Sequence, residues 1–419
     1  MIKKIKNIYK IFGPGILMAT AAIGGSHLVS STQAGALFGW SLAIFILLIN
    51  FFKYPFFLAN VQYTMATKKS LIEGYASLGN SWLWLFTILA VIAAVVNTAA
   101  VSMFAASLLG YFIPIKLTIN ILSFIIIFAC ILILIAGKYN LLNNVSKIIM
   151  ITLSIATVVA VVMAVTKDVN SALDDDFISP SAWTIASLGF IVILTGWMPA
   201  PIEISSIGSI WLKNQIKQTN INAKNALLDF NVGFIVTAIL AIFFLALGAL
   251  VLHGSAYEFK DGIAFSHQLV TMYSTVIGDW SRLLIAFIAF ACMFGTSITV
   301  IDGYGRAVAE AFSLIRKNRS ASNRSVAIWT IFISIIGFLI IIYFASSMRT
   351  MLDFAMILSF TTTPIFAFLN YKLVRSTKLP KELQNGMFLN ILSICGLIFL
   401  FGFLILFIIY RWFPFLIGL

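Results

Sequence analysis

Charged side chains are scarce in this chain of 419 residues. They make up 10% of the sequence, whereas hydrophobic residues make up 61%. A soluble domain of this length needs charge to cover its water-facing surface. The composition therefore excludes an ordinary soluble protein and predicts a chain that lies in a membrane.

Cysteine is also rare, and its placement excludes a disulfide framework. The three cysteines, Cys130, Cys292 and Cys395, all fall inside apolar runs. Their spacing matches no disulfide or metal pattern, so they are expected to be small apolar side chains in helices. Short segments of alternating polarity, which a lipid-facing β-barrel would require, are absent as well.

Long apolar runs are what the sequence does contain. Each reaches about 18 residues or more, enough for a helix to cross a hydrocarbon core of about 30 Å. The pattern predicts an all-α membrane protein with about eleven transmembrane helices in a single transporter domain, 1–419. The expected spans are residues 11–38, 42–63, 84–113, 117–136, 148–165, 183–211, 230–252, 283–301, 326–344, 354–371 and 388–410.

The distribution of lysine and arginine predicts the orientation. If the N-terminus is cytoplasmic, the inner segments carry most of the basic residues, as the positive-inside rule requires. Two such segments contain Lys3, Lys4, Lys6, Lys10, Arg316, Lys317, Arg319 and Arg324. We therefore expect a multi-pass protein of a bacterial inner (plasma) membrane, N-in and C-out. The net charge of +13 then faces anionic lipid head groups, and no nucleic-acid partner is needed.

Two of the expected spans are interrupted in their middles. Residues 23–27 read Ile-Gly-Gly-Ser-His, and residues 195–201 read Thr-Gly-Trp-Met-Pro-Ala-Pro. Such sequences free backbone groups that lipid cannot satisfy, so they occur where backbone lines a cavity or a ligand. The breaks fall in spans one and six, which correspond in two five-span repeats, 11–165 and 183–371, followed by an extra helix, 388–410. This arrangement is typical of inverted-repeat transporters with a midplane site.

At these residues the chain resembles the Nramp family of divalent-metal transporters, in a divergent bacterial branch. The resemblance rests on the residues 13–15 (Gly-Pro-Gly), 33–36 (Gln-Ala-Gly-Ala), 53–57 (Lys-Tyr-Pro-Phe-Phe) and 198–199 (Met-Pro). It implies the LeuT-type fold, with a 5+5 inverted repeat and discontinuous helices 1 and 6, and it implies ion transport by a symporter.

The chain departs from the family pattern where the family binds metal. The family's Asp-Pro-Gly-Asn is replaced by residues 24–27, Gly-Gly-Ser-His, so that the carboxylate is lost and His27 stands in place of the asparagine. Met198 matches the family's metal-contacting methionine, whereas Ala200 replaces a histidine linked to proton movement. The acidic residues of the family's third span have no counterpart, and Asn97 and Ser102 are the polar candidates there.

The groups near the breaks define a candidate site. Imidazole and thioether suit Mn- or Fe-like cations better than Mg or Ca, so His27 and Met198 are the candidate metal ligands. Glu203 could supply the missing charge. Each of these three could instead have a structural role. The expected substrate-binding set is Ala21, Gly24, Gly25, Ser26, His27, Thr195, Met198 and Glu203.

An ionisable residue inside a span indicates function by default. Lys53 lies within the second span and needs a partner, for which Glu203, Asp302 and Asp229 are the candidates. Such a pair is either a proton-linked switch or a fixed structural pair. The expected coupling and gating residues are Lys53, Asn97, Thr296, Ser297 and Asp302.

The leading hypothesis is a secondary active transporter, not an enzyme, that moves a divalent metal cation by alternating access. One alternative is an ion-coupled transporter of a small organic solute such as an amino acid, because Gly24 replaces the family's metal-binding Asp. The other is a non-transporting sensor. We expect no cofactor, H⁺ or Na⁺ as coupling ion, membrane lipids and a small ion or molecule as partners, and a monomer.

Overall fold

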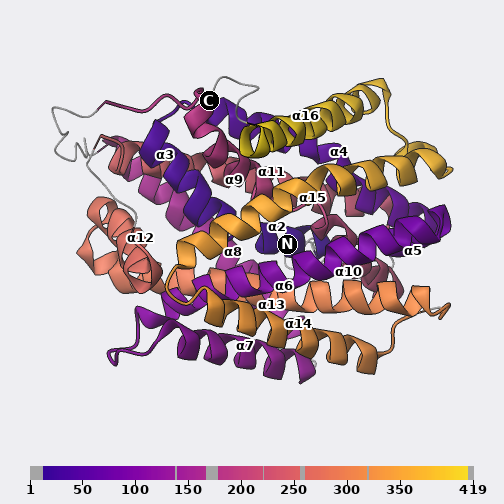
Figure 1. Ribbon diagram of the computed structural model, residues 1–419, viewed down its shortest axis with the longest axis horizontal. Coiled ribbons are helices and arrows are strands. Elements are labelled where there is room, and N and C mark those ends of the chain that lie inside the picture. Colours follow the sequence, from indigo (N-terminus) through magenta and orange to yellow (C-terminus); the bar gives the residue numbers. More distant parts are fainter. Residues whose placement is uncertain are drawn as a thin grey trace, which may run out of the picture.

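The computed structural model describes residues 13–136, 139–166, 178–219, 221–254, 260–318 and 320–413, with only the backbone for 139–147, 149 and 150. The basic residues Lys3, Lys4, Lys6, Lys10 and Arg319 lie outside the described residues. Helices follow one another throughout the described part (Figure 1). They are α2 (Pro14–Ala22), η1 (Ser26–Ser31), α3 (Thr32–Phe38), α4 (Ala43–Thr67), α5 (Leu71–Leu78), α6 (Asn80–Gly110), α7 (Ile119–Ile135), α8 (Tyr139–Thr166), η2 (Ile185–Ser187), α9 (Leu188–Trp197), α10 (Ile204–Gln218), α11 (Ala223–Val251), α12 (Gly262–Ile277), η3 (Asp279–Ser281), α13 (Arg282–Ile315), α14 (Asn323–Tyr343), α15 (Met348–Ser376), η4 (Lys381–Leu383) and α16 (Met387–Trp412).

The helices agree with the expected apolar runs. Seven helices of the described part are long and apolar enough to cross a membrane, and α7, α9 and part of α8 are shorter apolar helices. The first run consists of α2, η1 and α3, and the sixth consists of α9 and α10, which extends past the expected end at Trp211 to Gln218. The all-α architecture with discontinuous helices 1 and 6 is thus confirmed, while the count of eleven, the repeat boundaries and the orientation stay predictions.

Burial separates central helices from peripheral ones. In the apolar stretch of 18 residues that defines each span, 78% of the residues of α6 are buried inside the protein, whereas the share is 28% in α14 and in α16. Figure 1 accordingly shows α16 and α14 at opposite edges of the bundle, with α2 near its middle. The exposed faces of α14 and α16 carry large apolar side chains such as Ile335 and Ile398, as expected of helices in contact with lipid.

Both halves of the first span pack on α11 through glycine. A Cβ atom built on Gly15 would lie 2.3 Å from the backbone oxygen of Asp229, and one built on Gly35 would lie 2.0 Å from the backbone oxygen of Leu245. On the α11 side, a Cβ on Gly248 would lie 2.1 Å from the oxygen of Thr32. Small residues allow such backbone-to-backbone approach between membrane helices.

The start of α2 is held by a carboxylate from α11. Asp229 accepts hydrogen bonds from the backbone N–H of Gly13 (3.1 Å) and of Gly15 (2.7 Å), and its side chain is buried. A negative charge at a helix N-terminus is favourable because the unpaired N–H groups there carry partial positive charge. Asp229 therefore serves the first helix and does not pair with Lys53.

We expect Asp229→Asn to lower the stability of the fold. The amide offers one acceptor oxygen in place of a charged pair, and hydrogen bonds to charged groups each contribute about 1.5–3 kcal/mol. The measurement is the melting temperature of the purified protein in detergent. Asp279→Asn is the matched control, because Asp279 has an 86% exposed side chain at the start of another helix. Equal melting temperatures for the two variants would contradict this role of Asp229.

Ion pairs join α10 to its neighbours at the end of the bundle where α5 lies. Lys213 of α10 contacts Glu73 of α5 (2.6 Å) and Glu310 of α13 (3.0 Å). Ser70, which caps the start of α5, also donates to Glu310 (3.0 Å). All of these contacts are made by side chains, in contrast with the backbone contacts between the first span and α11.

Candidate substrate site at the two helix breaks

The first break frees carbonyl groups that side chains of α13 satisfy. α2 ends at Ala22, and the chain continues through Ile23 to the π-helix η1. The Thr296 hydroxyl donates to the carbonyl oxygens of Thr20 (3.1 Å) and Ile23 (3.4 Å). The Cys292 thiol also donates to the Ile23 oxygen (3.1 Å). The break is therefore held by polar side chains of one neighbouring helix, as required for irregular backbone in a membrane.

The second break is held by a lysine. Lys53 of α4 is fully buried, and its Nζ donates to the carbonyl oxygens of Thr195 (2.7 Å), Gly196 (3.3 Å) and Ala200 (3.4 Å). Thr195 and Gly196 belong to the last turn of α9, whose carbonyl groups have no partner within the helix. The positive charge also complements the negative end of the α9 dipole.

Glu203 lies in the second break itself, directly before α10. One of its carboxylate oxygens accepts a hydrogen bond from the Tyr304 hydroxyl (3.1 Å). The other oxygen is buried and has no hydrogen-bond partner among the described residues. Glu203 is close enough to Lys53 for their charges to interact, but the two form no direct ion pair.

A chain of hydrogen bonds leads from Glu203 across the site. The Asn97 amide donates to the Tyr304 hydroxyl (2.8 Å), and the Trp197 indole N–H donates to the Asn97 oxygen (3.2 Å). The same indole N–H lies 3.0 Å from the Ser359 hydroxyl. The network connects the second break with α6, α13 and α15, and so links the helices that surround the site.

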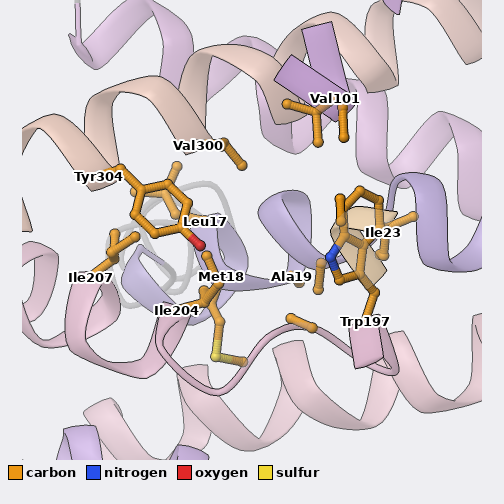
Figure 2. Packing of buried hydrophobic residues seen from close by; sticks show 14 of the residues in the cluster. Leu17, Met18, Ala19, Ile23, Val101, Trp197, Ile204, Ile207, Val300 and Tyr304 are labelled. Atoms are coloured by element: carbon orange, nitrogen blue, oxygen red, sulfur yellow. The ribbon is translucent and has the colours of Figure 1, made fainter. Parts of the chain in front are cut away.

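A small cavity lies between the two breaks, with a volume of about 30 Å³, room for about one or two water molecules. Figure 2 shows Tyr304 and Trp197 on opposite sides of this space, with Val300 and Val101 above it. The lining residues are Ala21, Ala22, Gly25, Ser26, Asn97, Val101, Trp197, Ala200, Pro201, Ile204, Thr296, Val300 and Tyr304.

Comparison with known families decides the identity of the chain. The model of the family described as Natural resistance-associated macrophage protein-like (Nramp) matches residues 15–410. The chain belongs to the Nramp family. It is accordingly a multi-pass membrane protein and a secondary transporter, not an enzyme.

Individual relatives agree with this assignment. A protein of Pasteurella multocida (strain Pm70), described as uncharacterized, is 48% identical over 404 residues, or 96% of this chain and 92% of that protein. A crystal structure of a mutant Eremococcus coleocola manganese transporter matches with a TM-score of 0.70 at 14% identity, covering 96% of this chain and 87% of that one. The structure of MhsT with L-phenylalanine matches with a TM-score of 0.65 at 13% identity, covering 93% and 98%. The two structures show the LeuT-type fold for this Nramp-family chain.

The expected metal ligands do not line the cavity of this Nramp-family chain. His27 is fully buried, and its ring nitrogens lie 2.7 Å from the Ser26 hydroxyl and 2.9 Å from the carbonyl oxygen of Thr237 in α11. Met198 is buried in an apolar cluster with Ala34 and other residues. Within the part of the chain that the structure describes, no group of three His, Cys, Asp or Glu residues could hold a metal ion. The metal assignment of His27 and Met198 stays a prediction.

The other candidate residues divide into two groups. Ala21, Gly25, Ser26, Asn97 and Thr296 lie around the cavity. The remaining ones lie beside it, as follows. A Cβ built on Gly24 would lie 3.2 Å from the Thr296 side chain and 3.3 Å from the Met293 sulfur. Thr195 accepts a hydrogen bond from Lys53, and the charge of Glu203 interacts with that of Lys53. Ser297 donates to the oxygens of Met293 and Val101.

Asp302 does not pair with Lys53, contrary to one expectation from the sequence. Its carboxylate contacts Arg306 one turn further along α13 (2.8 Å) and lies 3.5 Å from the Trp211 indole nitrogen. One turn of helix brings residues i and i+4 together on the same face, so Arg306 is the nearer cation. Of the three acids considered for Lys53, Glu203 is the one that interacts with it.

Reasoning from the sequence missed two residues of the site, Trp197 and Tyr304. Trp197 is the last residue of α9, between the candidate residues Thr195 and Met198, and its size and indole N–H were the available signal. Tyr304 is two positions beyond Asp302 and therefore on another side of α13. A search for charged residues in that span does not find it.

Proposed function

We propose that this Nramp-family chain moves its substrate by alternating access through the cavity between the two breaks, and that the substrate is a divalent metal cation of the Mn or Fe type. The observation that carries the proposal is the cavity itself, since it lies where both broken helices present backbone to one space. Discontinuous helices at a midplane site are the common arrangement of such transporters. Family membership supports the metal.

A metal in this chain would need donors other than the carboxylate and amide pair that the family uses. The free carboxylate oxygen of Glu203 is one donor, and the carbonyl oxygen of Thr195 is another once Lys53 withdraws. Divalent cations require such oxygen or nitrogen donors to replace their water. The ligand set is therefore proposed to be centred on the second break.

A small organic solute is the second candidate substrate, favoured by two observations. Lys53 already places a positive charge on the carbonyl groups of the second break, and the cavity combines apolar walls with the polar groups of Asn97 and Tyr304. Apolar pockets with a few placed polar groups are typical sites for small molecules.

Uptake into proteoliposomes tests the proposal, with Mn²⁺ and a panel of amino acids as the offered solutes. We expect saturable Mn²⁺ uptake that Gly25→Ala reduces at least about tenfold, because a Cβ there would lie 2.5 Å from the Trp197 ring and push it into the cavity. Gly189→Ala is the control, since nothing lies within 4 Å of its Cβ.

The outcomes separate the candidates. Uptake of an amino acid alone, with the same sensitivity to Gly25→Ala, would replace the metal by an organic solute. Uptake that Gly25→Ala and Gly189→Ala affect equally would contradict the route through the cavity. No uptake of either solute by a folded protein would contradict the proposal and favour a sensor.

A further inference from the structure

Lys53 occupies a defined site on the second break. Its Nζ is the meeting point of three carbonyl oxygens, those of Thr195, Gly196 and Ala200. A neutral amine has two N–H groups to donate, whereas an ammonium has three. The geometry therefore matches the charged form of the side chain.

The surroundings of these three oxygens are those of a cation site. They lie at the negative end of α9, where cations are favoured. The carboxylate of Glu203 lies near enough to interact with the charge, and one of its oxygens is buried without a hydrogen-bond partner in the described part of the chain. Converging backbone carbonyls together with a buried carboxylate form the kind of oxygen-rich site that binds hard cations.

We propose that the second break forms a cation-binding site which Lys53 fills as a tethered cation, so that removing this side chain creates a site for a free primary alkylammonium ion. Lys53 thereby holds the Thr195 oxygen against any incoming metal ion, which must displace the ammonium to use it. The proposal concerns the site itself and holds whichever substrate the protein carries.

Chemical rescue of Lys53→Ala tests the proposal. This substitution removes the length of an n-propylammonium ion, so that ion is the probe, and the melting temperature of the purified protein is the readout. We expect Lys53→Ala to melt well below the wild type, because three buried carbonyls lose their donor. Propylammonium should then raise the melting temperature with a saturable dependence on concentration.

Three controls identify what is recognised. Tetramethylammonium has the charge without N–H donors, and propanol has the shape without the charge, so neither should rescue Lys53→Ala. Lys53→Met fills the same space with an apolar chain, so propylammonium should not stabilise that variant. Lys213→Ala should not respond either, because this lysine contacts Glu73 and Glu310 and no such set of carbonyls.

Two results would overturn the proposal. One is a folded Lys53→Ala on which propylammonium has no more effect than tetramethylammonium. The other is a Lys53→Ala protein that does not fold even when purified in propylammonium, together with a Lys53→Met protein that has the melting temperature of the wild type. That combination would show that the site needs its space filled and does not need a cation.

Discussion

Glu203→Gln is expected to lower the melting temperature of the wild type much more than it lowers that of Lys53→Met. Glu203 and Lys53 are both buried and interact without direct contact, and charges interact over longer distances in a medium of low dielectric constant. Removing the acid leaves an uncompensated buried cation, which is strongly destabilising. Removing both charges avoids this penalty.

The double-mutant cycle measures the coupling directly. Neighbouring groups of this kind show coupling free energies of about 0.5–3 kcal/mol, which we expect to find from the unfolding of the four proteins in detergent. Asp302→Asn on the same Lys53→Met background is the control, because Asp302 contacts Arg306. Its effect should be additive with that of Lys53→Met. Additive effects for Glu203 as well would show that the two charges are independent.

Gly35→Ala is expected to reduce the yield and stability of folded protein strongly, although it adds only one methyl group to α3. The new methyl group would lie 2.0 Å from the carbonyl oxygen of Leu245, so α3 and α11 must move apart. Overpacking of a tight contact costs about 1–3 kcal/mol, occasionally more. The same argument applies to Gly248→Ala from the opposite helix.

Size-exclusion profiles and melting temperatures in detergent measure this effect. Gly402→Ala is the matched control, because Gly402 also lies in an apolar helix but has nothing within 4 Å of its Cβ. Alanine has a higher helix propensity than glycine, so the control should melt at or above the wild-type temperature. A Gly35→Ala protein that behaves like the control would contradict the close packing of α3 on α11.

The arrangement of the helices could be predicted from the sequence because its signals are local. Long apolar runs define helices in a membrane, and the glycine pair at 24–25 and the prolines at 199 and 201 mark the two interruptions wherever the rest of the chain lies. The family resemblance then placed these interruptions in a known fold. Both inferences need only the identity of neighbouring residues.

The contacts of the site could not be predicted in the same way. The partners of Lys53 are carbonyl groups 142 to 147 positions away. Backbone oxygens leave no trace in residue identity, so the sequence indicated acidic residues as the partners. His27 lies in the π-helix η1, and its ring contacts the carbonyl oxygen of Thr237 in α11. Neither the π-helix nor this distant contact has a signal in the sequence.

The glycine contacts of the first span constrain how the molecule can change shape. α2 and α3 each touch α11 backbone to backbone, at Gly15 and at Gly35. Surfaces packed this closely cannot shift along each other without a clash between the two backbones. We therefore expect these three helices to travel as one rigid body, with no independent hinge at residues 23–25. Relative movement of helices would then be easiest at the ion pairs of Lys213. Its long side chain can change rotamer there and exchange Glu73 for Glu310 as its partner.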